Sequence, residues 1–414
     1  MTTARPTSTI QSLILAGLLL GGCAQSIATP PANTASIAGG SGPAAASATE
    51  TKARAVKIAL LLPMSGMGEP AQIARGMKQA AEMALFEADN PAIQLIAKDD
   101  GGTAAGAMAA ADAAIAEGAE IILGPLFAKS VTGAATAALK TSTPIIAFSN
   151  DPAVAGRGVY LMSFMASEEV SRVVSFASSR GKRRFAALIP QTDYGKTLEA
   201  PFRQAVSAVG GELVQLESYA TDSMSMLAAA KRVFATVSEA EKAGRPVDAL
   251  FVPGGQETIG QLGPLLSYSG IDTRKIKLIG TSAWDVPVIS RDEQLIGGWY
   301  AASDPEAWTA FSDKFRKTFG SAPPRLASLS YDAATMAISL AALPVAERYA
   351  AANLTRPSGF PGVDGTVRLK SDGMAERGLA VLEIEKYRSV VIDAAPRDGA
   401  NGRVSSGEST VKAF

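Results

Sequence analysis

The sequence contains no histidine, and this absence removes several kinds of chemistry at once. Histidine is the usual general base in enzymes and the commonest side chain on transition metals. Without it, Ser-His-Asp and Cys-His catalytic groups are excluded, as are zinc sites built on imidazole. Basic and acidic residues number 39 each, so the net charge is zero and nothing points to nucleic acid as a partner.

Cysteine is nearly absent too, because Cys23 is the only one and no disulfide can form within the chain. It follows Arg5 and a short apolar segment, residues 13–20, which together are typical of a secretory signal. We therefore predict a signal peptide over residues 1–22. The Leu-Gly-Gly-Cys junction resembles a bacterial lipobox, which implies a lipid on Cys23 that anchors the chain to a membrane surface. Ala24 in place of an aspartate favours the outer membrane, and a free thiol after ordinary cleavage is the alternative.

Large apolar side chains are scarce in residues 23–55, where Ala, Ser, Thr, Pro and Gly dominate. Such a composition buries too little surface to offset chain entropy, so we predict a disordered tether there and a disordered tail over 396–414. The remaining stretch of about 340 residues suits two domains. No Walker-type glycine-rich loop occurs, and Ser-x-x-Lys occurs in a basic loop and in the tail. We therefore expect a binding protein that is not an enzyme and uses no cofactor or metal.

The folded part begins with an unbroken apolar run, Ile58 to Leu62, without alternation of polar residues. This pattern is typical of a parallel strand that helices cover on both faces. Further strand-like runs and amphipathic helices alternate as far as Asp151, and a second series begins near Ser167. Regular alternation of this kind predicts right-handed βαβ units and an α/β fold in two parts.

Seven short motifs carry a resemblance to a known family. They are Ile58–Gly66, Asp99–Asp100, Ile122–Pro125, Asp193–Gly195, Ile279–Thr281, Tyr331–Ala333 and Gly362–Gly365. In this order they resemble the type I periplasmic binding proteins of the leucine/isoleucine/valine-binding kind. Three further segments, residues 147–151, 323–332 and 376–383, look like the lipoprotein subgroup of penicillin-binding-protein activators.

The resemblance implies two Rossmann-like lobes joined by three crossovers, which we expect near Ser163, Ser282 and Ala346. The expected boundaries are 56–163 plus 283–346 for lobe 1, and 164–282 plus 347–395 for lobe 2. In this family the lobes close on a ligand by hinge motion, so a small polar ligand is expected in the cleft between them.

Candidate ligand-binding residues follow the predicted strands, because α/β sheets bind ligands at the carboxyl ends of their strands. The candidates are Ser65, Phe127, Lys129, Ser130, Ser149, Asn150 and Asp151 from lobe 1, Tyr194, Gln256 and Glu257 from lobe 2, and Trp284 and Asp285 at a crossover. An amino acid would need N–H groups and hydroxyls for its carboxylate and an acid for its ammonium.

The loops after the third and fourth strands depart from the family's amino-acid binders, which place small hydroxyl residues there. Phe127 and Asp151 stand in these loops, and an aspartate repels a carboxylate unless Lys129 compensates. Two interpretations are open for Asp151, which either meets the ligand or caps the turn before Pro152. Tyr194 likewise either stacks on a ligand or packs between the lobes.

Two functions fit this resemblance. The first is a lipid-anchored regulator that contacts a cell-wall synthase, a penicillin-binding protein. The second is the substrate-binding subunit of an ABC importer for an amino acid or a related small molecule, with an ABC permease as partner. Outward sorting of the lipid anchor favours the regulator, because an importer's receptor must reach a permease in the inner membrane.

Overall fold

A computed structural model describes residues 55–66, 68–286 and 288–396, all within one compact unit. The predicted signal peptide, Cys23 and most of the predicted tether and tail lie outside the described residues. Within the described ranges, no helix is long and apolar enough to cross a membrane. No group of three or more acidic, histidine or cysteine side chains that could hold a metal ion occurs in them either.

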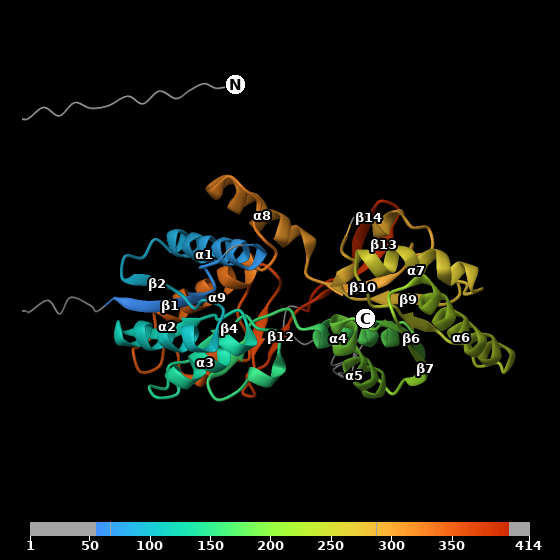
Figure 1. Ribbon diagram of the computed structural model, residues 1–414, viewed down its shortest axis with the longest axis horizontal. Helices are drawn as coiled ribbons and strands as arrows, with labels where there is room; N and C mark the ends of the chain where they lie inside the picture. Colours follow the sequence, from blue (N-terminus) through green and yellow to red (C-terminus); the bar gives the residue numbers. More distant parts are fainter. Residues whose placement is uncertain (1–54, 67, 287, 397–414) are drawn as a thin grey trace, which may run out of the picture. The chain divides into compact units, whose positions relative to one another are not determined.

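The first sheet is parallel and has the strand order β2-β1-β3-β4-β5. Figure 1 shows β1 and β2 of this sheet between helices α1 and α2. Its strands are β1 (Val56–Leu62), β2 (Ile93–Asp99), β3 (Ala119–Leu123), β4 (Ile145–Ala147) and β5 (Val159–Leu161). Its helices are α1 (Glu69–Ala88), α2 (Ala104–Ala116), α3 (Ala128–Ala138) and α9 (Ala327–Leu340).

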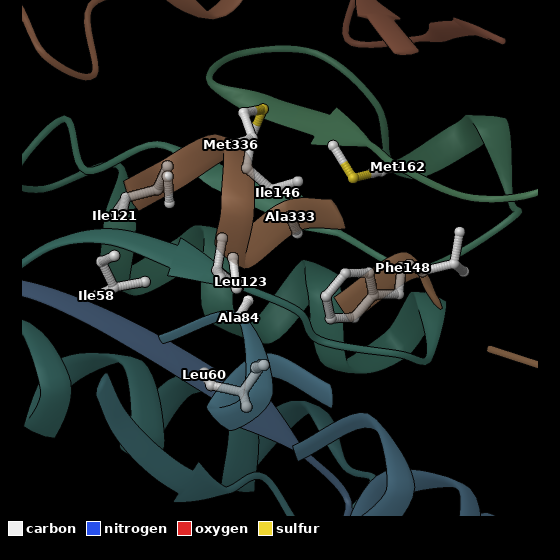
Figure 2. Close-up of a cluster of buried hydrophobic side chains, with 14 of the residues drawn as sticks. Ile58, Leu60, Ala84, Ile121, Leu123, Ile146, Phe148, Met162, Ala333 and Met336 are labelled. Atoms are coloured by element: carbon white, nitrogen blue, oxygen red, sulfur yellow. The ribbon is translucent and has the colours of Figure 1, made fainter. Parts of the chain in front are cut away.

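Helices cover both faces of this sheet, which explains the unbroken apolar run of β1. Ile58 and Leu60 point into a core formed with α1 and α9, whereas Ala59 and Leu61 point into a core formed with α2 and α3. Figure 2 shows the first of these cores, which α9 joins although it lies more than 260 residues after β1 in the chain. Burying each such leucine or isoleucine contributes about 1.5–3 kcal/mol to folding.

The second sheet has the order β14-β13-β10-β9-β8-β6-β7. Its strands are β6 (Arg184–Pro190), β7 (Glu212–Tyr219), β8 (Ala249–Phe251), β9 (Lys277–Gly280), β10 (Trp299–Ala302), β13 (Ala380–Glu385) and β14 (Arg388–Asp393). Its helices are α4 (Ala166–Ser179), α5 (Asp193–Ala208), α6 (Ser223–Lys242) and α7 (Gln256–Tyr268). The strands from β7 to β10 run parallel, and β13 and β14 add an antiparallel edge.

The boundaries between the two lobes differ from the predicted ones at two places. Strand β10 falls in the segment 283–346 predicted for lobe 1, yet it pairs with β9 and β13 of the second sheet. The short hairpin β11 (Val367–Leu369) and β12 (Ala375–Arg377) falls in the segment predicted for lobe 2. Its apolar side chains Val367, Leu369 and Ala375 pack in the core of β1, α1 and α9 instead.

The chain therefore crosses between the lobes three times, as predicted, but the second and third crossings lie at other points than predicted. It crosses between β5 and α4 near the predicted Ser163, then after β10, and finally between β12 and β13. After the second crossover, α8 (Pro305–Phe319) packs on α1 through Phe311 and Phe315, and the one-turn helix α10 (Ala351–Leu354) follows α9. The predictions near Ser282 and Ala346 were wrong because sheet pairing depends on partners far away in the sequence.

Candidate ligand-binding cleft

A cavity of about 940 Å³ lies where loops from both sheets meet. Residues Asn150–Pro152 reach it from the loop after β4, Tyr194 from the loop after β6, Gly255 from the loop after β8 and Ser282 from the loop after β9. Each of these strands is parallel within its sheet, so all four loops lie at carboxyl ends. This is the position at which open α/β sheets bind ligands.

Two smaller cavities adjoin the first one, and Phe164 lines all three. One, of about 370 Å³, shares Glu169 with the large cavity and adds Trp308 and Arg325. The other, of about 420 Å³, extends along Phe127 beside the start of α1. We call these three cavities together the cleft.

Glu169 is the buried acid of the cleft, with 7% of its surface exposed in the first turn of α4. Its carboxylate accepts hydrogen bonds from the backbone N–H of Ser282 at 2.9 Å and from the Ser282 hydroxyl at 2.7 Å. Burial raises the pKa of Glu169 to about 7, although these hydrogen bonds and the charge of Arg325 act in the opposite direction. The site thus holds a carboxyl group that titrates near neutral pH.

Arg325 is held between two aromatic rings at one side of the cleft. Its guanidinium carbon lies 4.5 Å from the ring centre of Phe164 and 4.4 Å from that of Trp308. Both terminal nitrogens donate to the fully buried carboxylate of Asp364, and a terminal nitrogen also donates to Ser328. Burial by itself would raise the pKa of Asp364, but the Arg325 hydrogen bonds and the charge of Arg377 hold it below the usual value.

Tyr194 connects two loops of the second lobe at the mouth of the large cavity. Thr192 caps helix α5 by accepting a hydrogen bond from the N–H of Gly195, which positions Tyr194 in the first turn. The Tyr194 hydroxyl then donates to or accepts from the Thr281 hydroxyl at 2.8 Å. Tyr194 is 38% exposed as a residue and lines the cavity, so it is available to a ligand.

A family model described as periplasmic binding protein matches residues 55–388, most of the chain. The chain belongs to the periplasmic binding protein family. The predicted family and its two-lobed α/β fold are thereby confirmed, and membership implies a periplasmic location. The finer resemblance to penicillin-binding-protein activators stays a prediction, as do the lipid anchor and its membrane.

Individual relatives of this periplasmic binding protein are distant. An uncharacterized protein of Rickettsia prowazekii is 24% identical over 234 residues, which span 56% of this chain and 61% of that protein. A putative branched-chain amino acid ABC transporter structure from Rhodospirillum rubrum has a TM-score of 0.70 at 18% identity, covering 82% of this chain and 100% of that one. A leucine binding protein from Thermotoga maritima has a TM-score of 0.51 at 20% identity, covering 83% and 100%. At these identities the two structures support the fold alone.

The binding protein places four predicted residues of lobe 1 in different surroundings. Phe127 lines the cleft. Ser65 is exposed and hydrogen-bonds to Asp99, and Lys129 is exposed as well, but neither lines the three cavities. Ser130 is fully buried, and its hydroxyl lies 3.5 Å from the carbonyl oxygen of Thr103. Of these four predicted residues, Phe127 lines the cleft and the other three do not.

The loop after β4 contributes two of its three predicted residues. Asn150 and Asp151 line the large cavity, whereas Ser149 is buried and its hydroxyl accepts from the N–H of Asp151 at 3.2 Å. Asp151 also accepts from the N–H of Ala153 at 2.9 Å and so caps the 3-10 turn Pro152–Val154. Asp151 therefore caps the turn and also lines the cavity, and its contact with a ligand stays a prediction.

The predicted residues of lobe 2 and of the crossover also differ in whether they line the cleft. Trp284 differs from expectation, because it is 1% exposed in the core of the second lobe and its ring N–H donates to the carbonyl of Val252. Asp285 is exposed, lines the cavity beside Arg325, and accepts from the Tyr300 hydroxyl at 3.2 Å. The side chains of Gln256 and Glu257 lie outside the described part of the chain.

Among the residues of the cleft that sequence reasoning missed, four matter most here: Phe164, Glu169, Trp308 and Arg325. Two of them left a signal. Arg325 stands in the Pro-Pro-Arg-Leu segment that carried the resemblance, and Glu169 occupies the first turn of the helix that follows the first crossover. The other two are aromatic residues on a crossover and on α8, and nothing local distinguishes them from core residues.

Proposed function

We propose that this chain is a non-enzymatic binding protein that holds a small molecule in the cleft and delivers it to an ABC permease. The observation that carries the proposal is the cavity of about 940 Å³ at the carboxyl ends of strands from both lobes. Pockets of this size, lined by apolar rings and a few polar groups, suit small ligands. The residues proposed to contact the ligand are Phe127, Asn150, Asp151, Phe164, Glu169, Tyr194, Asp285, Trp308 and Arg325.

The importer role takes first place over the cell-wall regulator. The two solved structures named above are described as a putative amino acid ABC transporter and a leucine binding protein, which supports transport as the use of this fold. No relative reported above is described as a penicillin-binding-protein activator, so the regulator role rests on the lipoprotein resemblance alone.

A calorimetric titration tests ligand binding directly. The purified protein is titrated with a panel of amino acids, amines and carboxylates, and at least one compound is expected to bind with a micromolar dissociation constant. Ala200 lines the cavity from α5, so an Ala200→Trp variant fills it and is expected to weaken that binding by about tenfold or more. Ala208 lies exposed near the end of the same helix and does not line the cavity. An Ala208→Trp variant is therefore the matched control, and absence of binding by the whole panel would refute the proposal.

Membrane fractionation tests the anchor and the partner. We propose that a lipid on Cys23 holds the chain at a membrane, so the protein is expected in the membrane fraction and the Cys23→Ser variant in the soluble fraction. Recovery with the inner membrane supports delivery to a permease. Recovery with the outer membrane contradicts the importer role and favours the regulator.

A further inference from the structure

Both cations that line the cleft among the described residues already have carboxylate partners. Arg325 lies between the rings of Phe164 and Trp308 and donates two N–H groups to Asp364. The Lys196 ammonium lies 3.1 Å from Asp193, and its side chain is 67% exposed to water. Since each positive charge is matched or solvated, neither gives an anionic ligand a strong partner.

Glu169 has no partner of this kind. In the described part of the chain, no lysine or arginine nitrogen lies within 4.0 Å of its carboxylate, and its oxygens accept hydrogen bonds from the neutral Ser282. The group is nevertheless buried and lines both the large cavity and the adjoining one beside Arg325. A buried carboxylate without a cation is costly, so a ligand that brings a positive charge to it gains the binding energy of a buried pair.

A ligand carboxylate, in contrast, would not meet the two hydroxyls that follow the third and fourth strands. The hydroxyl of Ser130 is buried next to α2, and that of Ser149 is bonded within its own turn. The first turns of α4 and α5, whose N–H groups could hold an anion, carry Glu169 and Asp193. Acids in these positions occupy the positive ends of the helices and repel a second anion.

We propose that the cleft binds a small amine or amidine with an apolar body and no carboxylate, its charged nitrogen beside Glu169 and its body against Phe164, Tyr194 and Trp308. These three rings line the cavities that Glu169 also lines. Aromatic faces attract cations as well as apolar groups, which suits the same ligand class. This inference rests on the proposed function, because it assigns the ligand class of the same cleft.

Three probes that share one apolar body separate the ligand classes. The purified protein is titrated calorimetrically with 3-methylbutylamine, with leucine and with 4-methylpentanoate, which carry an amine, both groups and a carboxylate respectively. We expect the amine to bind about tenfold or more tightly than leucine, and the carboxylate to bind most weakly. If leucine or 4-methylpentanoate binds as tightly as the amine, this inference fails and the proposed function stands. If no compound of the wider panel binds, the proposed function fails as well.

A variant and a pH series identify the group responsible. Glu169→Gln keeps the shape and removes the charge, so amine affinity is expected to fall about tenfold or more, while Glu199→Gln on the outer part of α5 leaves it unchanged. In the unmodified protein, amine affinity is expected to rise from pH 6 to pH 8 as Glu169 loses its proton. Arg325 and Tyr194 face this carboxyl, and burial raises the pKa of Tyr194, so its hydroxyl keeps its proton in that range. An affinity independent of pH would overturn the inference even where the variant fails to fold.

Discussion

Replacing Glu169 by glutamine is expected to change how the stability of the ligand-free protein depends on pH. Burial raises the pKa of this carboxyl from 4.5 in the unfolded chain to about 7 in the folded one. A raised pKa means that the folded state holds the proton more tightly, so the contribution to stability is complete below pH 4.5 and is lost as pH rises through 7. The loss amounts to about 3 kcal/mol in the free energy of unfolding, at 1.36 kcal/mol for each pKa unit.

Glutamine can keep the hydrogen bonds with Ser282 but carries no charge at any pH. The variant is therefore expected to match the unmodified protein near pH 4.5 and to exceed it at pH 8, by an amount on the order of 3 kcal/mol. Urea denaturation followed by circular dichroism at pH 4.5, 6, 7 and 8 measures the difference.

Subtracting the free energy of unfolding of one protein from that of the other at each pH removes the contributions of other titratable groups. Burial also raises the pKa of Asp332 to about 7, although Arg377 lowers it, and this group remains in both proteins. Glu199→Gln, an exposed helical pair with Arg203, is the control and is expected to give a difference that does not vary with pH. A difference for Glu169→Gln that stays constant from pH 4.5 to pH 8 would refute the reasoning, because it would mean that the buried carboxyl is not perturbed.

Three further predictions concern buried partners and side-chain packing. Asp364→Asn removes the charge of a fully buried carboxylate that binds Arg325 with both oxygens. It is expected to lower the free energy of unfolding by about 3 kcal/mol in urea denaturation. A loss below about 1 kcal/mol would contradict this expectation. Trp284→Phe leaves the buried carbonyl of Val252 without its donor and is expected to lower the free energy of unfolding by about 1–3 kcal/mol. Ligand affinity measured by calorimetry is expected to stay unchanged. A loss of affinity would place Trp284 in the binding site again. Gly76→Ala places a methyl group against Pro324 and is expected to destabilise the protein by about 1–3 kcal/mol. Gly260→Ala places its methyl group in open space on a helix and is expected to stabilise the protein by about 0.5–1 kcal/mol. Equal effects of the two substitutions in thermal denaturation would contradict this contrast.

The membrane that holds the lipid anchor and the identity of the ligand both bear on the proposed ABC permease partner. An importer's binding protein releases its ligand to a permease in the inner membrane, so the location found by fractionation and the class found by calorimetry bear on one proposal. A protein that binds amines and fractionates with the inner membrane fits delivery to an ABC permease.

Local sequence patterns were sufficient for the fold. The unbroken apolar run Ile58–Leu62 predicted a strand covered on both faces, and β1 does pack on helices at both faces. This succeeds because burial on two faces requires apolar side chains at every position of a strand, whatever its partners are. The alternation of strands and helices and the ordered family motifs likewise reflect short-range constraints.

Tertiary structure alone decided the lobe boundaries and the site. Strand β10 joins the second sheet through pairing with β9 and with β13, which lies about 80 residues later, and no local pattern encodes such a pairing. Trp284 and Tyr194 are both aromatic residues shortly after a strand, yet Trp284 is buried in the core and Tyr194 lines the cavity. The difference depends on which distant segments cover each ring. The same holds for Glu169, because burial raises the pKa of its carboxyl although the hydrogen bonds from the distant Ser282 lower it.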